Sequence, residues 1–154
     1  MSDEAFMRLA LDEARAALVH DDVPVGAVVV RDGLVVSSAH NRRELLHDAT
    51  AHAEIIAIRR ACERAGSWHL EGCTIFVTME PCAMCAGAMV ASRLDRVVYA
   101  APDLRAGAAY SLYNIVQDPR LNHRCEVTSE VLAELSVELL QTFFASKRGE
   151  QQSL

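Results

Sequence analysis

Apolar and polar residues follow two spacings along this chain, one helical and one extended. From about Ser2 to His20, and again from Ser129 to Ala145, apolar residues recur every three or four positions, which predicts two amphipathic helices. Between them lie two β-branched runs, Val25–Arg31 and Leu34–Ser38, separated by Asp32-Gly33. Asp-Gly between two such runs is a strong signal for a tight β-hairpin. The first run is almost entirely apolar, as expected for a central strand covered on both faces.

The same criteria place the remaining elements. We expect helices over residues 51–65 and 82–92, strands over 73–79, 96–100 and 126–128, a loop over 40–50 and a short helical turn over 111–116. Helices and strands that alternate in this way are typical of an α/β fold, here a three-layer α/β/α sandwich around a five-stranded mixed sheet. A chain of 154 residues can bury its own core, so residues 1–154 are expected to form one domain, with a flexible tail after about residue 148.

Composition and charge narrow the class of protein. No apolar run reaches the ~18 residues that a membrane-spanning helix needs. The acidic N-terminus lacks the features of a signal peptide, and an odd count of five cysteines argues against a disulfide framework. We therefore expect a cytoplasmic protein without a membrane partner. The net charge of −6 argues mildly against nucleic acid as a partner, although a local basic patch would be compatible with it.

Two short segments carry residues with metal-binding chemistry. His52 and Glu54 lie two residues apart, and Cys82 and Cys85 lie three apart, directly after Pro81. One histidine and two thiolates suit Zn²⁺, and three protein ligands are typical of a catalytic site, which keeps its fourth position open. Glu54 then stands beside the open position, where a carboxylate can carry protons to and from a water whose pKa the metal lowers. Both segments fall where a helix is expected to begin, and the positive ends of the helix dipoles favour thiolates.

A redox role or a purely structural metal would account for fewer of these residues. A redox-active pair of Cys82 and Cys85 would leave His52 and Glu54 without a role, and a zinc finger of the four-cysteine type would need a second C-x-x-C, which the chain lacks. An RNA-binding or interaction module with a structural zinc would have no need of Glu54. The pattern H-x-E…P-C-x-x-C is typical of zinc nucleobase deaminases, in which a zinc-bound hydroxide attacks a ring carbon and its amine leaves as ammonia. The metal motif alone leaves cytosine, adenine and guanine equally open.

Beyond the metal motif, the chain resembles the bacterial tRNA-specific adenosine deaminases from about Ala5 to Arg148. The matching segments are residues 23–28 (VPVGAV), 41–42 (NR), 50–55 (TAHAEI), 80–89 (EPCAMCAGAM), 107–109 (GAA) with Ser111, and 121–124 (LNHR). The resemblance implies a cytidine-deaminase-like fold, one Zn²⁺ per subunit and a cytoplasmic homodimer. It also implies a tRNA anticodon stem-loop as partner, in which the wobble adenosine is attacked at C6 and becomes inosine. A single-stranded loop suits this reaction because extruding its base costs little stacking.

The resemblance further assigns roles to individual residues. His52, Cys82 and Cys85 would hold the zinc, and Glu54 would be the catalytic proton shuttle. The residues implied in substrate binding are Val25, Ala27, Asn41, Ala53, Pro81, Asp103, Asn122, His123 and Arg124.

The chain departs from the family pattern in the segments around the site. Arg43 and Ala49 stand where prolines are usual, which predicts a less rigid loop before His52. Pro102 stands where a basic residue is common, and Tyr110 replaces a glycine, so a positive φ at residue 110 would be strained. The alternative substrate is a small free base or nucleotide, such as guanine or cytosine, which Tyr110 and the acidic net charge favour.

Overall fold

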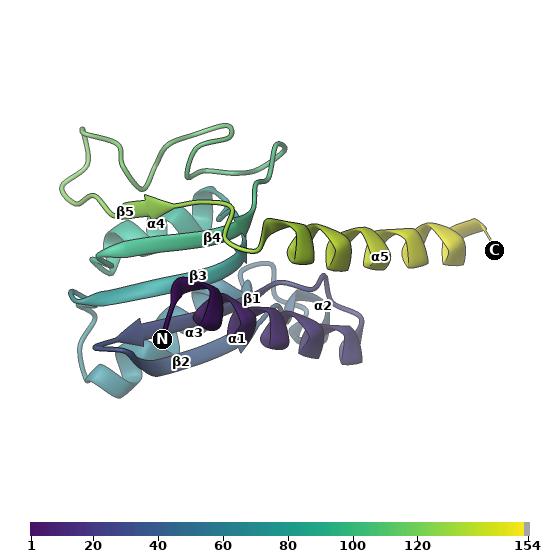
Figure 1. The fold of residues 1–154 in the computed structure, drawn as a ribbon, viewed down its shortest axis with the longest axis horizontal. Helices are drawn as coiled ribbons and strands as arrows, with labels where there is room; N and C mark the ends of the chain where they lie inside the picture. The colour runs from purple at the N-terminus through teal and green to yellow at the C-terminus, as the bar shows by residue number, and fades with distance from the viewer. Residues whose placement is uncertain (153–154) are drawn as a thin grey trace.

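The chain alternates helices and strands from end to end, and the computed structural model describes residues 1–152 (Figure 1). The elements are α1 (Asp3–Ala16), the 3-10 helix η1 (Ala17–His20), β1 (Gly26–Arg31), β2 (Leu34–His40), α2 (Arg43–Leu46), α3 (Ala53–Ala65), β3 (Cys73–Met79), α4 (Ala83–Ala91), β4 (Arg96–Ala101), β5 (Glu126–Thr128) and α5 (Ala133–Gln152). Ser2 caps α1 by accepting a hydrogen bond from the backbone N–H of Ala5, which satisfies one of the free donors at the helix start.

The five strands form one mixed sheet in the order β2-β1-β3-β4-β5. β1 pairs with β2 and β3 in antiparallel fashion, whereas β3, β4 and β5 run parallel. The predicted hairpin is confirmed: Asp32 and Gly33 have φ values of 51° and 75°, as a tight turn with two left-handed residues requires. α4 connects the parallel strands β3 and β4, so its N-terminus lies at the C-terminal edge of β3.

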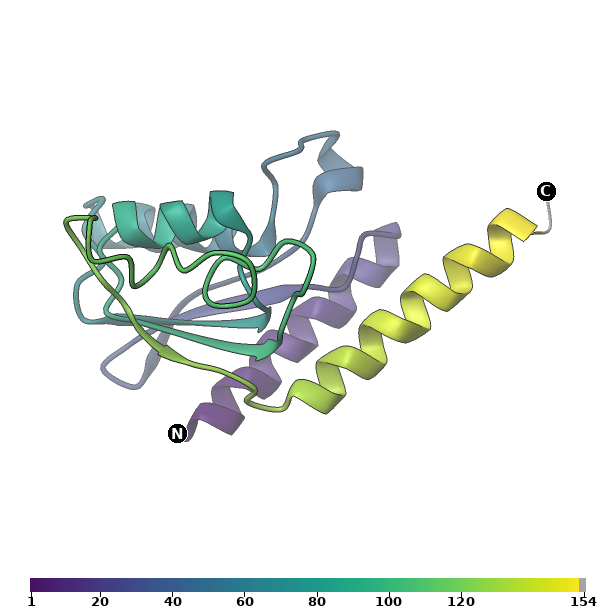
Figure 2. The ribbon, with the colours of Figure 1, turned by 90° about the horizontal axis from the view of Figure 1, so that it is seen from above.

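Helices cover both faces of the sheet, which confirms the α/β/α fold (Figure 2). One core lies between the sheet and the pair α1 and α5, where Phe6 and Met7 meet the strand residues Val28 and Phe76. The other core lies between the sheet and the pair α3 and α4. Alternate residues of β1 enter the two cores, because successive side chains of a strand point to opposite faces. The nearly apolar sequence of this strand follows from its burial on both faces.

A glycine allows the closest contact between α1 and the sheet. A β-carbon at Gly26 would overlap the carbonyl oxygen of Ala10 and the backbone nitrogen of Ala14. The start of β1 therefore packs directly against the backbone of α1, and this contact sets the position of the segment that precedes β1.

Three local expectations from the sequence are wrong. Residues 43–46 form the short helix α2 where a loop was expected, and residues 111–116 form turns instead of a helical turn. The last helix runs over Ala133–Gln152, four residues later at its start and seven at its end than predicted. Its C-terminal part extends beyond the sheet in Figure 1. Among the described helices, none is both long and apolar enough to cross a membrane.

Candidate active site

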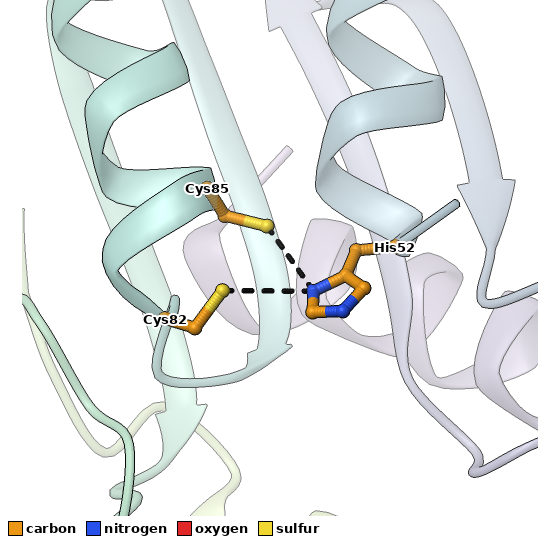
Figure 3. Close-up of side chains that lie close together, drawn as sticks. All are labelled: His52, Cys82 and Cys85. Atoms are coloured by element: carbon orange, nitrogen blue, oxygen red, sulfur yellow. Dashed lines mark hydrogen bonds between the residues drawn. The ribbon is translucent and has the colours of Figure 1, made fainter. Parts of the chain in front are cut away.

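Two helix starts bring three possible metal ligands to one point (Figure 3). His52 is the N-cap residue of α3, Cys82 is the N-cap residue of α4, and Cys85 lies in the first turn of α4. The Nδ1 atom of His52 lies 3.6 Å from Sγ of Cys82 and 3.4 Å from Sγ of Cys85. The cluster His52, Cys82 and Cys85 is the one group of three or more possible ligands found within residues 1–152.

The backbone at the two N-caps explains why the ligands converge. His52 and Cys82 both have extended backbone, with ψ values of 151° and 176°, whereas the residues that follow them are helical. At each cap the side chain therefore lies at the end of the helix axis. One turn of α4 separates Cys82 from Cys85, so both sulfurs face the same point.

The arrangement fits a tetrahedral zinc ion. With bonds of ~2.3 Å to sulfur and ~2.1 Å to nitrogen at tetrahedral angles, a histidine nitrogen and a cysteine sulfur would lie about 3.6 Å apart. The two nitrogen–sulfur distances of 3.6 Å and 3.4 Å agree with this value. Three soft donors that converge in this way can hold a metal ion and leave one position open for another molecule.

The two cysteines differ in protonation. A hydrogen bond from Cys85 is the main cause that lowers the pKa of the Cys82 thiol to about 3, and a hydrogen bond from His52 adds to it against the effect of burial. The same pairing with Cys82, together with burial, raises the pKa of the Cys85 thiol. The hydrogen bond to Cys82 also raises the pKa of His52. The site thus already favours a thiolate at Cys82, which is the form that binds metals.

Glu54 is a buried carboxyl group beside this cluster. It lies in the first turn of α3 and only 4% of its surface is exposed. Burial raises its pKa above the ordinary value of a glutamate, although the nearby His52 opposes this shift. A carboxyl group with a raised pKa can both accept and return a proton near neutral pH, as general acid–base catalysis requires.

A cavity of about 250 Å³ opens beside the cluster. Pockets for drug-sized ligands usually hold ~300–1,000 Å³, so this space suits a single flat ring system. Seven residues that the sequence indicated line it, namely Val25, Asn41, His52, Ala53, Glu54, Cys82 and Asp103. The amide of Asn41 is also part of the scaffold, because its Nδ2 donates to the carbonyl of Val23 and its Oδ1 accepts from the N–H of Arg43.

Glu80 anchors the loop that forms the far wall of the cavity. Its carboxylate is 3% exposed and accepts five hydrogen bonds, from the N–H groups of Asp103, Ala109, Tyr110 and Ser111 and from the hydroxyl of Ser111. Burial alone would raise the pKa of this carboxyl, but the hydrogen bonds outweigh burial and keep the pKa below its usual value. We call residues 103–111 the Glu80 loop. It contributes Asp103 and Ala106 to the cavity wall.

The Glu80 loop also explains two sequence features. A β-carbon at Gly107 would overlap the Glu80 carboxylate, so only glycine allows the loop to pack so closely on it. Tyr110, by contrast, does not have a positive φ, and its side chain is 80% exposed. The expected strain at Tyr110 is therefore absent, and the tyrosine is compatible with the loop.

Five of the residues implied in substrate binding lie outside the cavity wall. Ala27 is fully buried in the core between the sheet and α3. The cavity is lined instead by Val23 and Val25, which precede β1. Pro81 is buried, and its carbonyl accepts a hydrogen bond from Ala108.

The other three lie at the opposite end of α4 from its cysteines. Asn122 lines a hollow there with Val90 and Ala91. His123 contacts the carbonyl of Leu94 at 2.6 Å, and Arg124 donates to the carbonyl of Pro119. Within one chain these residues stabilise the segment before β5, and their part in substrate binding stays a prediction.

Six residues that line the cavity had no role assigned from the sequence: Val23, Arg43, Met79, Glu80, Ala106 and Phe144. Glu80 and Val23 belong to segments that support the resemblance, so their motifs could have indicated them. Phe144 comes from α5, about sixty residues beyond the cysteines in sequence. The apolar spacing of this helix places its neighbour Phe143 on the buried face and gives no indication of Phe144, which contacts Phe143 edge to face.

Comparisons with known proteins support a deaminase site. Residues 1–148 match the MafB19-like deaminase family. A tRNA-specific adenosine deaminase of Aquifex aeolicus is 46% identical over 149 residues, which are 97% of this chain and 98% of that protein. A solved structure from studies of A-to-I editing by tRNA:A34 deaminases at the wobble position is 45% identical, with a TM-score of 0.85, over 88% of this chain and 99% of that chain.

A guanine deaminase of Nitrosomonas europaea shares the fold at lower identity. Its structure is 26% identical, with a TM-score of 0.78, over 94% of this chain and 85% of that chain. Of these two structures, the tRNA:A34 deaminase has both the higher sequence identity to this chain and the higher TM-score. The chain belongs to the MafB19-like deaminases and, within them, to the family of tRNA-specific adenosine deaminases.

Proposed function

We propose that this protein hydrolyses the exocyclic amine of the wobble adenosine in a tRNA anticodon loop, which yields inosine and ammonia. The observation that carries the proposal is the likeness to a tRNA:A34 deaminase structure over 88% of the chain, together with a cavity of about 250 Å³ beside Glu54. A cavity of this size accepts one base that has been extruded from its strand. An anticodon loop presents such a base with little stacking to lose.

His52, Cys82 and Cys85 would hold one Zn²⁺ per subunit. The donor set supports this metal, because one imidazole and two thiolates at the separations seen here match tetrahedral N/S ligation. When bound, zinc supplies a Lewis acid that lowers the pKa of a water in its open position. The protein contributes the orientation of the ligands, since both helix caps are fixed by the α3 and α4 backbones.

Glu54 moves the protons. Its carboxylate accepts a proton from the attacking water and delivers it to N1 of adenine, while the oxygen of that water bonds to C6. It then accepts the second proton of the same water and delivers it to the exocyclic nitrogen, so that the C6–N bond breaks and ammonia leaves. Burial of Glu54 supports this role, because its raised pKa suits a group that is protonated and deprotonated in turn.

The remaining cavity residues hold the base and exclude water. Val23 and Val25 supply an apolar wall, Asn41 supplies amide hydrogen bonds, and the backbone at Ala53 faces the same space. Phe144 and Asp103 stand on other parts of the wall, where the nucleotides that flank the extruded base would pass. Arg43 brings a cation to this wall in a chain of net charge −6 and is suited to a phosphate contact.

The enzyme works as a cytoplasmic homodimer. The surface that supports a dimer lies at the C-terminal end of α4, where Val90, Ile115 and Leu121 line an apolar hollow beside the exposed Trp68. Exposed apolar patches of this kind are typical of protein–protein interfaces. The sedimentation of the purified protein would test this state.

The test of the proposed function uses an anticodon stem-loop with adenosine at the wobble position. A matched stem-loop with the adenosine moved one position along the loop is the control. We expect inosine in the first RNA only, and equal conversion of both would contradict recognition of the wobble position. A Glu54→Ala variant should bind the same RNA and retain its metal but show no turnover. Activity that survives in Glu54→Ala would disprove the proton-shuttle role.

A further inference from the structure

Four titratable side chains are connected by a continuous series of short contacts. Nδ1 of His40 lies 2.8 Å from Oε2 of Glu13, and Nδ1 of His20 lies 2.7 Å from Oδ2 of Asp22. The two imidazoles meet through their Nε2 atoms, which are 3.2 Å apart. The order in space is Glu13, His40, His20 and Asp22. Both histidine side chains are largely buried, with 14% and 16% of their surface exposed.

The hydrogen bonds of this quartet need one more ring N–H group than two neutral imidazoles possess. Each ionised carboxylate can only accept, so both Nδ1 atoms must carry hydrogen. The contact between the Nε2 atoms needs a third N–H, because two lone pairs facing each other at 3.2 Å would repel. Neutral imidazole has one N–H, so three N–H groups on two rings make one of them an imidazolium. The quartet then holds one positive charge between two negative ones.

Asp22 connects this quartet to the segment that lines the cavity. Its carboxylate is fully buried and accepts hydrogen bonds from the N–H groups of Glu44 at 2.7 Å and Leu45 at 3.2 Å. These two residues belong to α2, directly after Asn41 and Arg43, which line the cavity. We call residues 41–46 the substrate loop.

The substrate loop has few other anchors. Asn41 is held by the backbone of Val23 and Val25, and Arg42 donates to the carbonyl of Ala51. The four residues of α2 have no buried side chain, so packing does not hold this helix in place. The Asp22 carboxylate is therefore the main fixed point for the part of the loop that follows Asn41.

We propose that His20 and His40 are positioning residues for the substrate loop, and that they act as a proton-sharing imidazole pair that ties Asp22 to Glu13 of α1. The shared proton supplies a positive charge between the buried carboxylate of Asp22 and the partly exposed carboxylate of Glu13. Without it Asp22 would be a buried anion with no cation beside it, and its hold on Glu44 and Leu45 would loosen. The expected effect on substrate binding rests on the proposed function. The expected number of ring N–H groups on His20 and His40 does not.

The other charged groups around the pair do not replace the bridging proton. On the side of His20 a shallow cavity is lined by Asp21, Glu44 of α2 and Lys147 of α5. Lys147 is paired with Asp21. Glu13 reaches His40 from α1. The one cation among these groups is thus already paired with another side chain.

The test has two parts, a count of the N–H groups on the two histidine rings and a kinetic comparison of variants. Protein labelled with ¹⁵N at histidine, in its metal-loaded form at neutral pH, should show three ring N–H groups on His20 and His40 together. Assignment comes from the His20→Gln and His40→Gln variants. Two N–H groups in total, one on each neutral ring, would overturn the inference whatever the enzyme deaminates.

The kinetic arm separates positioning from plain stability. His40→Gln and His20→Gln should each raise KM for the stem-loop about tenfold, the equivalent of one hydrogen bond to a charged group, with kcat and metal content within about twofold of the parent. Because the two rings act as a unit, the double variant should also show about a tenfold change instead of a hundredfold one. His69→Gln is the matched control, since His69 also contacts a carboxylate, Glu71, but lies at the surface.

Two other outcomes of the kinetic arm would count against the proposal. Unchanged KM in both single variants, or a lower kcat with unchanged KM, would assign the pair a structural role only. If the parent enzyme leaves the stem-loop untouched, the proposed function fails, and KM is then measured for the free base or nucleoside that it does deaminate.

Discussion

Glu80→Gln is the substitution whose effect follows most directly from the structure. The glutamine keeps the shape of Glu80 but replaces one acceptor oxygen by an NH₂ group. In the parent protein one oxygen accepts three backbone N–H groups and the other accepts the N–H of Asp103 and the hydroxyl of Ser111. The glutamine would place its NH₂ toward Asp103, because the hydroxyl of Ser111 can turn and become an acceptor. The N–H of Asp103 then loses its partner.

These contacts determine how much stability the variant loses. Losing one charge-assisted hydrogen bond costs about 2 kcal/mol, and the weaker neutral acceptor at the other oxygen adds about 1 kcal/mol or more. We expect Glu80→Gln to lower the free energy of unfolding by about 3 kcal/mol, which is about 10 °C in Tm for a chain of this size. KM should rise as well, because the Glu80 loop carries Asp103 into the cavity wall. Glu71→Gln, at a carboxylate with 57% of its surface exposed, is the control and should change Tm little.

The pH dependence of stability provides a second test of the role of Glu80. The pKa of Glu80 is lower in the folded protein than in the unfolded chain. Its contribution to stability is therefore complete above the ordinary carboxyl pKa of ~4.3 and is lost as pH falls through the lower folded value. The Tm difference between the parent and Glu80→Gln should be constant from about pH 6 to 8 and shrink below about pH 4.5. If the Tm of Glu80→Gln lay within about 1 °C of the parent value at neutral pH, the Glu80 carboxylate would not anchor the loop.

Three further substitutions test the packing, the metal site and the cavity. Gly26→Ala would drive a β-carbon into the backbone of Ala10 and should lower the free energy of unfolding by about 2–3 kcal/mol in chemical denaturation, whereas Gly149→Ala, whose added β-carbon meets no atom within 4 Å, should cost nothing. Cys82→Ala should lose both metal, measured by elemental analysis, and activity, and full metal content in this variant would contradict the assigned ligands. Phe144→Ala should raise KM for the stem-loop about fivefold at unchanged metal content, because its half-exposed ring lines the cavity, and an unchanged KM would remove it from the binding site.

The sequence predicted best those features that depend on neighbouring residues. The strands β1 and β3 and the helix starts at His52 and Cys82 follow from local apolar patterns and from the spacing of the ligands. The Asp32-Gly33 turn is equally local, since its two positive φ values are a property of the two residues themselves.

Features that depend on distant residues could not be predicted in this way. The helix α2 has only four residues and is held by Asp22, about twenty residues earlier in the chain. The Glu80 loop is ordered by a carboxylate that lies 23 to 31 residues before its partners. Phe144 reaches the cavity because α5 packs across the sheet on α1's face, and its own helix gives no sign of this contact. Such contacts are set by tertiary packing, which overrides local propensity.

We propose that the site formed by His52, Glu54, Cys82 and Cys85 acts on a tRNA adenosine and not on a free base. The most direct measurement incubates the enzyme with an anticodon stem-loop carrying a wobble adenosine, and in parallel with guanine, cytosine, cytidine and free adenosine, and quantifies inosine and ammonia. We expect inosine at that single position, with the small molecules unchanged. Ammonia from guanine or another small substrate, with the stem-loop untouched, would keep the chemistry of Glu54 and contradict the substrate.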